Sequence, residues 1–179
     1  MSKLDGRVVL LNGPPSCGKT ALARALVTAS SRPWFHRSLD DFRSGYLDRF
    51  WRSDSGVLFE QVMRGYLGAL RAMALEGNDI IAEAVITPDR RALYRNAFDG
   101  LPVILVAVRC PLELAVQRER DRIDRVNGPL DLPADAFAAV HSGLKHDIDV
   151  DTSLDTPEVL AARLEPQLPA VTPEAFERM

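Results

Sequence analysis

The feature that most constrains the fold is the octapeptide GPPSCGKT at 13–20, which separates an apolar run from an amphipathic stretch. The apolar run, RVVLLNG at 7–13, is typical of a buried parallel strand, and residues 18–30 carry apolar side chains at helical spacing. The octapeptide matches the pattern G-x-x-x-x-G-K-[ST] in the strand–loop–helix setting that this pattern requires. It therefore predicts a phosphate-binding loop.

The residue types of this loop fit that chemistry. Gly13 and Gly18 let the backbone wrap closely around an anion, with amide N–H groups pointing inward at the positive end of the following helix. Lys19 would supply a mobile cation for the β- and γ-phosphates of a nucleotide, and Thr20 a hydroxyl for Mg²⁺. Lysine makes up only 3 of the 22 basic residues, so its presence in the loop favours a functional role. The other loop residues expected to contact nucleotide are Pro14, Pro15, Ser16 and Cys17.

Composition narrows the class of protein. A length of 179 residues with 46% hydrophobic residues fits one globular domain, 1–179. The net charge of -3 argues against a general nucleic-acid binder, and no run of 18 apolar residues is available to cross a membrane. The N-terminal stretch lacks a secretory signal pattern, and the two cysteines, Cys17 and Cys110, suit a reducing compartment. We therefore expect a cytoplasmic domain without nucleic-acid or membrane partners; the sequence leaves a homo-oligomer open.

Strand and helix patterns alternate along the whole chain. Further strands are predicted at 34–40, 79–86, 101–110 and 146–152, with 101–110 expected at the centre because it is the most apolar. Helices are predicted at 87–98, 111–125, 134–144 and 156–164, besides a long one that ends at the Gly77-Asn78 pair. The apolar face of that long helix is expected to carry Val57, Gln61, Met63, Leu67, Leu70, Met73 and Ala74. This alternation predicts an α/β fold, with a parallel sheet covered by helices on both faces.

Acidic residues fall where two of these strands end. Asp40 and Asp41 fall at the end of the predicted 34–40 strand, and Glu83 lies late in the third strand. Second substrates bind beyond the carboxyl ends of such strands, where a hydroxyl acceptor needs a carboxylate base and Mg²⁺ needs acidic support. At least one of the paired aspartates is expected to act as this base or to support the metal. The alternative is that the pair begins a helix, one residue as its N-cap and the other as an acid in its first turn. Glu83 would be costly to bury unpaired, so we expect it to face the site.

An arginine-rich segment, RERDRIDR at 118–125, follows the fourth strand. Arg118, Arg122 and Arg125 fall at i, i+4 and i+7, which would place three cations on one helical face. Mixed charge runs usually mean a solvated helix, but a bound polyphosphate would offset the repulsion between these arginines. We therefore expect an arginine-bearing lid at about 118–133, which would exclude water from the site.

With these features in place, the chain resembles the chloramphenicol phosphotransferase family, small P-loop kinases related in fold to nucleoside-monophosphate and shikimate kinases. The matching stretches, in order, are LNGPPSCGKT, PWFHRSLDDF, VILVAVRC, RERDRIDRVNG and VHSGLKHDIDVDT, and the resemblance runs from the first strand to about Leu164. It implies a three-layer P-loop NTPase sandwich with about five parallel strands. It also implies ATP-dependent, magnesium-supported phosphorylation of a hydroxyl group on a small molecule, with GTP as another possible donor.

The resemblance also implies roles for individual residues. Asp40 matches the family's proposed base, Arg122 and Arg125 match the lid arginines, and Arg118 matches a further basic position. Together with the loop, this gives four expected catalytic residues: Asp40, Lys19, Arg122 and Arg125. Arg118 and Arg122 are also expected to bind nucleotide, and Thr20 and Asp41 to support the metal. The acceptor is expected to contact Asp40, Glu83, Phe42 and Trp51.

The chain departs from the family pattern near the acceptor. Ala82-Glu83 stands where the chloramphenicol enzyme has two adjacent aspartates, and residues 42–59 match poorly. The aromatic residues expected either to line an acceptor pocket or to pack in the core are Trp34, Phe42, Tyr46, Phe50 and Trp51. The acceptor is therefore open between an antibiotic and a metabolite or sugar nucleotide, as in gluconate-type or zeta-toxin-like kinases. A nucleotide-binding switch without an acceptor is a third hypothesis.

Overall fold

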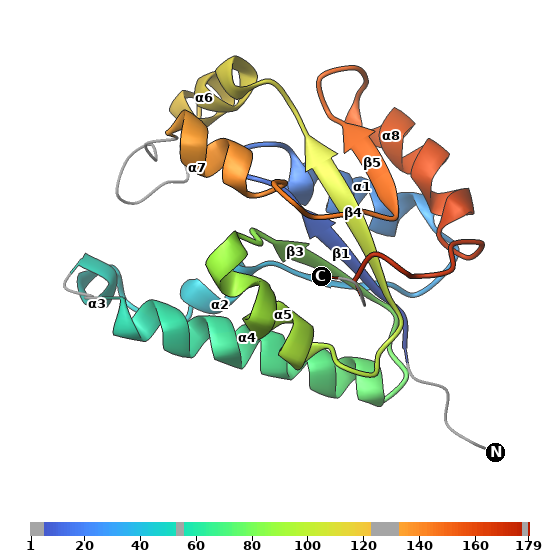
Figure 1. Ribbon diagram of the computed structural model, residues 1–179, viewed down its shortest axis with the longest axis horizontal. Coiled ribbons are helices and arrows are strands. Elements are labelled where there is room, and N and C mark those ends of the chain that lie inside the picture. Colours follow the sequence, from blue (N-terminus) through green and yellow to red (C-terminus); the bar gives the residue numbers. More distant parts are fainter. Residues whose placement is uncertain (1–5, 53–55, 123–132, 177–178) are drawn as a thin grey trace.

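The computed structural model describes residues 6–52, 56–122, 133–176 and 179, and the structural statements below refer to these. Its centre is a parallel sheet in the order β2-β3-β1-β4-β5 (Figure 1). The strands are β1 (Val8–Asn12), β2 (Phe35–Arg37), β3 (Ile80–Ala84), β4 (Val103–Arg109) and β5 (Ile148–Asp151). The predicted α/β architecture is confirmed.

Helices cover both faces of this sheet (Figure 1). One face packs against α4 (Val57–Leu75) and α5 (Arg91–Ala97), and the other against α1 (Lys19–Ala29) and α8 (Pro157–Leu164). The shorter elements are α2 (Leu39–Arg43), α3 (Asp48–Arg52), α6 (Leu112–Arg120), α7 (Ala134–Ala139) and the 3₁₀ turns η1 (Pro88–Arg90) and η2 (Glu165–Gln167). The result is a three-layer sandwich in which the sheet is screened from water on both sides.

The strand sequences explain why the sheet lies in the middle. Every residue of β1 and β3 is buried, as expected for parallel strands that have helices on both faces. The register pairs Leu11 with Glu83 and Leu11 with Val106, so β1, β3 and β4 end at the same edge. The loop at 13–20 follows β1 at this edge, which therefore holds the candidate site.

Several predicted boundaries were wrong. β1 holds the middle position and β4 lies beside it. Both strands are buried between two helical layers, so apolar composition does not decide which of them is central. β2 ends at Arg37, where Ser38 caps α2, so the paired aspartates lie in a helix rather than at a strand end. α6 ends at Arg120 and α7 at Ala139, both earlier than predicted.

The buried face of α4 also differs in part from its prediction. Met63, Leu67, Leu70 and Ala74 are buried as predicted, whereas Val57 and Gln61 are exposed. The missed members of this face are Val62 and Tyr66. The helix ends before Gly77, whose φ of 89° is the left-handed conformation expected of a glycine there.

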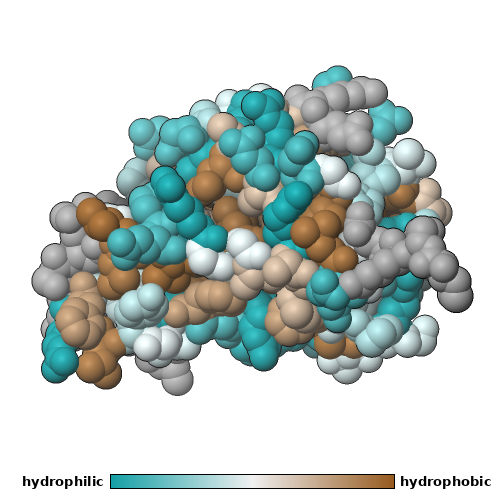
Figure 2. Space-filling model, turned by 90° about the horizontal axis from the view of Figure 1, so that it is seen from below, coloured by the Kyte–Doolittle hydropathy of each residue, from teal (hydrophilic) through white to brown (hydrophobic). Residues whose placement is uncertain are grey.

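Exposed apolar side chains gather around the end of the molecule where α3 lies. They are Leu47, Phe50 and Val57, and the brown atoms at the left of Figure 2 mark this end.

In the described part of the chain, no helix is both long enough and apolar enough to cross a bilayer.

Candidate active site

The loop at 13–20 curls tightly between β1 and α1. A Cβ atom on Gly13 would lie 2.4 Å from the carbonyl oxygen of Val108, so only glycine fits there. Gly18 has a φ of 99°, and a Cβ atom on it would approach the side chain of Thr152 to 3.2 Å. The two glycines of the motif therefore permit the loop's shape, in one case by size and in the other by conformation.

Lys19 lies inside this curl. Its side chain is only 8% exposed, and Nζ donates hydrogen bonds to the carbonyl oxygens of Gly13 at 2.8 Å and Pro14 at 2.7 Å. Neither acceptor carries a full charge, so the buried ammonium group keeps the loop positive. An anion in the loop would neutralise that charge at the N-terminus of α1.

Glu83 joins the loop to the neighbouring strand. Thr20 Oγ1 donates to Glu83 Oε2 at 2.8 Å, and His36 Nε2 lies 3.0 Å from Glu83 Oε1. The carboxylate is 9% exposed, so both contacts offset the cost of burying its charge. Three elements, α1, β3 and β2, thus meet at a single carboxylate.

Tyr66 of α4 fixes the backbone beneath that carboxylate. Its hydroxyl accepts from the Glu83 N–H at 3.1 Å and lies 3.1 Å from the carbonyl oxygens of Glu83 and Arg37. Burial raises the pKa of Tyr66 well above its ordinary value, so the phenol stays protonated and can donate. The end of β3 is therefore held rigidly against α4.

The hydroxyl of Thr20 and the carboxylate of Glu83 fit the needs of Mg²⁺. Both are oxygen ligands, and Mg²⁺ is usually bound through one or two protein groups together with phosphates and waters. Thr20 is exposed, so this corner of the site is open to solvent. The residues present are thus compatible with a magnesium ion bound beside a nucleotide.

Asp40 and Asp41 occupy different positions in the first turn of α2. Asp41 forms a capping box with Ser38, whose N–H donates to Asp41 Oδ2 at 2.7 Å. Asp40 is 57% exposed and pairs with Arg43 at 3.1 Å. Asp41 therefore stabilises the helix start in this structure, while Asp40 presents its carboxylate to solvent.

The arginines expected on one helical face do not all lie on one helix. Arg118 lies on α6 and donates to the Thr152 hydroxyl and carbonyl oxygens, both at 2.9 Å. The Thr152 hydroxyl in turn donates to the Cys17 carbonyl oxygen at 2.6 Å, which links Arg118 to the phosphate loop. Arg122 lies beyond the helix end, so the prediction that it shares a helical face with Arg118 was wrong. Arg125 and most of the predicted lid lie outside the described residues.

The cysteine of the loop is buried and packs among apolar side chains. Cys17 is 0% exposed, and burial raises the pKa of its thiol, although Lys19 acts in the opposite direction. The proximity of a helix N-terminus therefore does not make this thiol acidic. The unreactive interpretation fits the structure better.

The five aromatic residues considered for an acceptor wall do not form one surface. Trp34 is buried in the core on the α1 side of the sheet, and Phe42 packs edge-on against Tyr66 on the other side, with centroids 5.3 Å apart. Trp51 packs edge-on against Tyr46 at 5.9 Å and lies beneath the Arg43 guanidinium. Trp51 and Phe42 therefore lie near α2, while Trp34 is remote from the acceptor side.

Sequence reasoning missed several partners of the site. His36 contacts Glu83, Thr152 holds Arg118, and Ser16 donates to the buried carboxylate of Glu119. His36 could have been noticed because the chain has only 3 histidines, one of them inside the PWFHRSLDDF stretch. Ser16 and Glu119 are 103 residues apart, and nothing in either local pattern connects them.

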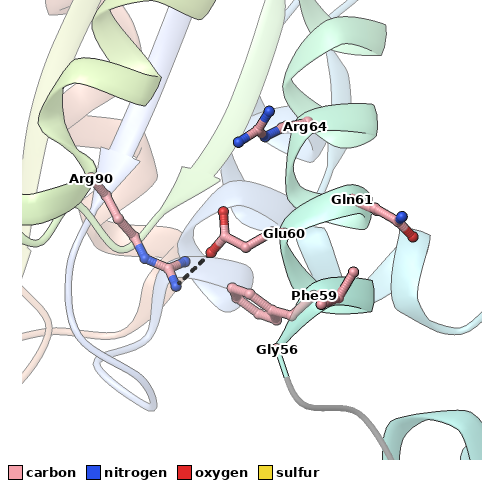
Figure 3. A pocket seen from close by; sticks show the side chains of 7 residues that line it. Gly56, Phe59, Glu60, Gln61, Arg64 and Arg90 are labelled. Atoms are coloured by element: carbon pink, nitrogen blue, oxygen red, sulfur yellow. Dashed lines mark hydrogen bonds and ion pairs between the residues drawn. The ribbon is translucent and has the colours of Figure 1, made fainter.

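An open cavity of about 580 Å³ lies where α4 begins, facing η1 (Figure 3). Glu60 pairs with Arg90 at 3.3 Å, and the Arg90 guanidinium stacks over the Phe59 ring at 4.8 Å. Arg64 extends from α4 toward the same side as Glu60, whereas Gln61 extends away. The remaining lining residues are Gly56 and Val57. This cavity falls partly within the 42–59 region that departs from the family pattern.

Comparison with known proteins agrees with this geometry. Residues 6–169 match the family model described as chloramphenicol phosphotransferase-like protein. A Mycobacterium tuberculosis protein provisionally named an O-phosphotransferase is 28% identical, over 98% of this chain and 88% of its own length.

Two solved structures share the fold at low identity. The M. tuberculosis APS kinase in complex with AMPPNP and APS is 15% identical with a TM-score of 0.65, over 93% of this chain and 99% of its own. The Acinetobacter baumannii shikimate kinase in complex with shikimate is 18% identical with a TM-score of 0.61, over 94% of each chain. The match to the family model spans nearly the whole sequence. The chain therefore belongs to the chloramphenicol phosphotransferase-like family, and it is a phosphotransferase of the small-molecule kinase class.

Proposed function

We propose that the protein transfers the γ-phosphoryl group of ATP to a hydroxyl group on a small molecule, with Mg²⁺. The observation that carries the proposal is the junction at Glu83, which joins the phosphate loop through Thr20 to the strand beside it. Thr20 directly follows Lys19, whose buried ammonium group bonds to the carbonyl oxygens of the loop. Phosphoryl transfer needs this combination, because its catalysis consists mainly of positioning and of neutralising phosphate charge.

Lys19 would exchange neutral partners for charged ones when a triphosphate enters. Its bonds to the carbonyls of Gly13 and Pro14 keep the ammonium group at the loop. Phosphate oxygens would form stronger, charge-assisted bonds with the same group. Thr20 and Glu83 would hold Mg²⁺, which when bound neutralises charge on the β- and γ-phosphates.

Asp40 is the better of the two candidate bases. Both carboxylate oxygens of Glu83 are engaged, one by Thr20 and the other by His36. Asp40 uses one oxygen for Arg43 and is exposed at the same edge of the sheet, so it can take a proton from an acceptor hydroxyl. Asp41 remains a predicted metal ligand, with its carboxylate in the capping box when no metal is bound.

The arginines complete the proposed nucleotide site. Arg118 is oriented by Thr152, next to the turn that carries Cys17 and Gly18. We assign Arg118 to nucleotide binding, and Arg122 and Arg125 to the charge that develops on the transferred group. A cytoplasmic location, where ATP is abundant and Cys17 and Cys110 stay reduced, is part of the proposal.

The acceptor has two candidate classes. The family description favours an antibiotic resembling chloramphenicol, which would make the enzyme a resistance or self-protection kinase. A charged metabolite is favoured by the cavity at the start of α4. There the side chain of Arg64 makes no hydrogen bond or ion pair in the described part of the chain, while the side chain of Arg90 already pairs with Glu60. An unpaired guanidinium on the wall of a cavity is suited to a carboxylate or phosphate on the acceptor.

Transfer of labelled γ-phosphate from ATP to a panel of hydroxyl compounds tests both the function and the acceptor class. The panel pairs hydroxylated antibiotics, chloramphenicol included, with hydroxy acids, sugar nucleotides and neutral esters or amides of those acids. For an acidic acceptor, Arg64→Gln should raise KM about tenfold or more, while Arg24→Gln on the exposed side of α1 should not. Equal turnover of acids and neutral analogues would remove the charged-metabolite candidate. No transfer to any member would count against the proposed function.

A further inference from the structure

Asn12 joins three segments at the start of the phosphate loop. It is the last residue of β1, directly precedes Gly13 and is 0% exposed. Its Oδ1 accepts from the Ile86 N–H at 2.9 Å, and its Nδ2 donates to the Val140 carbonyl oxygen at 3.2 Å. The same Nδ2 lies 3.3 Å from Nε2 of His146.

These contacts fix the proton positions at His146. A backbone N–H can only donate, so the Asn12 atom that faces Ile86 is the amide oxygen. The amide nitrogen therefore faces Val140 and His146, and it too can only donate. His146 Nε2 must then be an acceptor, which makes the imidazole neutral with its proton on Nδ1.

The surroundings of His146 agree with a neutral ring. His141 packs edge-on against it with ring centroids 5.3 Å apart. The charged groups that face it are Arg109 from β4, Asp149 from β5 and Asp147 beside it, and Arg109 and Asp149 are paired at 2.5 Å. Burial lowers the pKa of His146, and burial together with Arg109 lowers the pKa of His141 to about 4.

The contacts of Asn12 connect the loop to the part of the chain between α7 and β5. Val140 caps the C-terminus of α7, directly after Ala139, and His146 lies two residues before β5. On the other side of Asn12, the Gly13 carbonyl is an acceptor for Lys19 Nζ. A change at His146 can therefore reach the loop lysine through one buried amide and one peptide unit.

We propose that Asn12 is a positioning residue for the phosphate loop, and that His146 supports it only while its imidazole is neutral. Protonation would place an N–H of His146 against the N–H of the Asn12 amide, and their hydrogen bond would be lost. The unfolded chain binds this proton more readily than the folded one, so the stabilisation begins to fall as pH drops below about 6.5. The contact itself is lost only when pH falls below the lowered pKa of His146 in the folded protein. The consequence for activity rests on the proposed nucleotide binding, whereas the tautomer of His146 does not.

Nitrogen-15 NMR of histidine side chains tests the tautomer directly. At neutral pH the wild-type protein should show His146 with an unprotonated Nε2 and a protonated Nδ1, the resonance being assigned by its loss in His146→Gln. A protonated Nε2 at neutral pH would overturn the proposal. In Asn12→Asp the carboxylate can only accept, so Nε2 should become protonated and the pKa of His146 should rise by at least about one unit. The matched control, Asn96→Asp on the exposed side of α5, should leave the resonance unchanged.

ATP affinity measured against pH tests the coupling to the loop. Wild-type Kd for ATP should rise on acidification from about pH 7 to below the pKa of His146, as found by the NMR titration, by roughly tenfold more than in His146→Gln, the effect of one lost hydrogen bond. The glutamine variant keeps an acceptor for Asn12 at every pH, and protonation of ATP itself affects both proteins equally. Identical pH profiles would overturn the coupling. If neither protein binds ATP at any pH, the proposed function fails, while the NMR result still decides the tautomer and hence the hydrogen-bonding half of the proposal.

Discussion

Replacement of the Glu83 carboxylate by an amide separates its structural role from its chemical one. In Glu83→Gln the amide oxygen can still accept from His36, and the amide nitrogen can donate to Thr20, whose hydroxyl is able to rotate. Both contacts at 2.8 Å and 3.0 Å can therefore survive with their geometry nearly unchanged. What is lost is the negative charge beside Thr20.

The expected magnitudes follow from this geometry. A hydrogen bond to a charged group contributes about 1 kcal/mol more than a neutral one, which gives a loss of roughly 2 kcal/mol for two bonds. Burying a neutral amide costs less free energy than burying a carboxylate, which offsets part of that loss. The net destabilisation is therefore about 1 kcal/mol. For a chain of this length, we expect the melting temperature to fall by about 2–4 °C. Loss of the charge that supports Mg²⁺ should lower kcat by about 10²-fold.

Thermal unfolding and steady-state phosphoryl transfer, measured on the same preparation, check both magnitudes. Glu113→Gln makes the same chemical change on the exposed surface of α6 and should leave kcat unchanged. The reasoning is refuted if Glu83→Gln keeps wild-type kcat. It is equally refuted if the variant fails to fold, since the amide should preserve both contacts.

Two further predictions concern α2 and the cysteines. Asp40→Ala should lower kcat by about 10²-fold or more with ATP affinity retained, whereas Ser38→Ala should mainly lower the free energy of unfolding, by about 1 kcal/mol, through loss of the helix cap. Kinetic assays and denaturant titration of both variants measure these effects. If the aspartate were only structural, Asp40→Ala would lower the free energy of unfolding and leave kcat unchanged. Burial raises the pKa of Cys110 to about 11 and also raises that of Cys17, so a thiol reagent near neutral pH should label the native protein at least about 10²-fold more slowly than the unfolded chain. Equally fast labelling of native and unfolded protein would contradict the buried, unreactive assignment.

The sheet was predictable because its strands are short apolar runs separated by helical patterns. Apolar composition predicts the strands Val8–Asn12 and Val103–Arg109, and the four fixed positions of the motif predict the phosphate loop. Burial on both faces makes such strands alike, however, so composition could not decide which strand is central. The order of the strands depends on pairings between distant segments, which no local pattern records.

The same limit explains which site residues were missed. The sequence indicated that Glu83 needs a partner, but His36 reaches it only because β2 lies beside β3. Asn12 ends a strand in the sequence pattern as in the structure, but its side-chain contacts with Ile86, Val140 and His146 depend on distant segments. The charge run after Arg118 favoured a longer helix, whereas α6 ends at Arg120. Local patterns thus located the loop and the acids, while long-range contacts determine how they are held.

The central claim is that the loop at 13–20 grips the phosphates of ATP through Lys19, with Mg²⁺ held by Thr20 and Glu83. Calorimetric titration of the full-length protein with ATP, with and without Mg²⁺, measures this directly. The account predicts one saturable site that binds more tightly with Mg²⁺, and whose affinity falls by at least about tenfold in Lys19→Ala. Unchanged affinity in that variant, or no saturable binding by the wild-type protein, would contradict it.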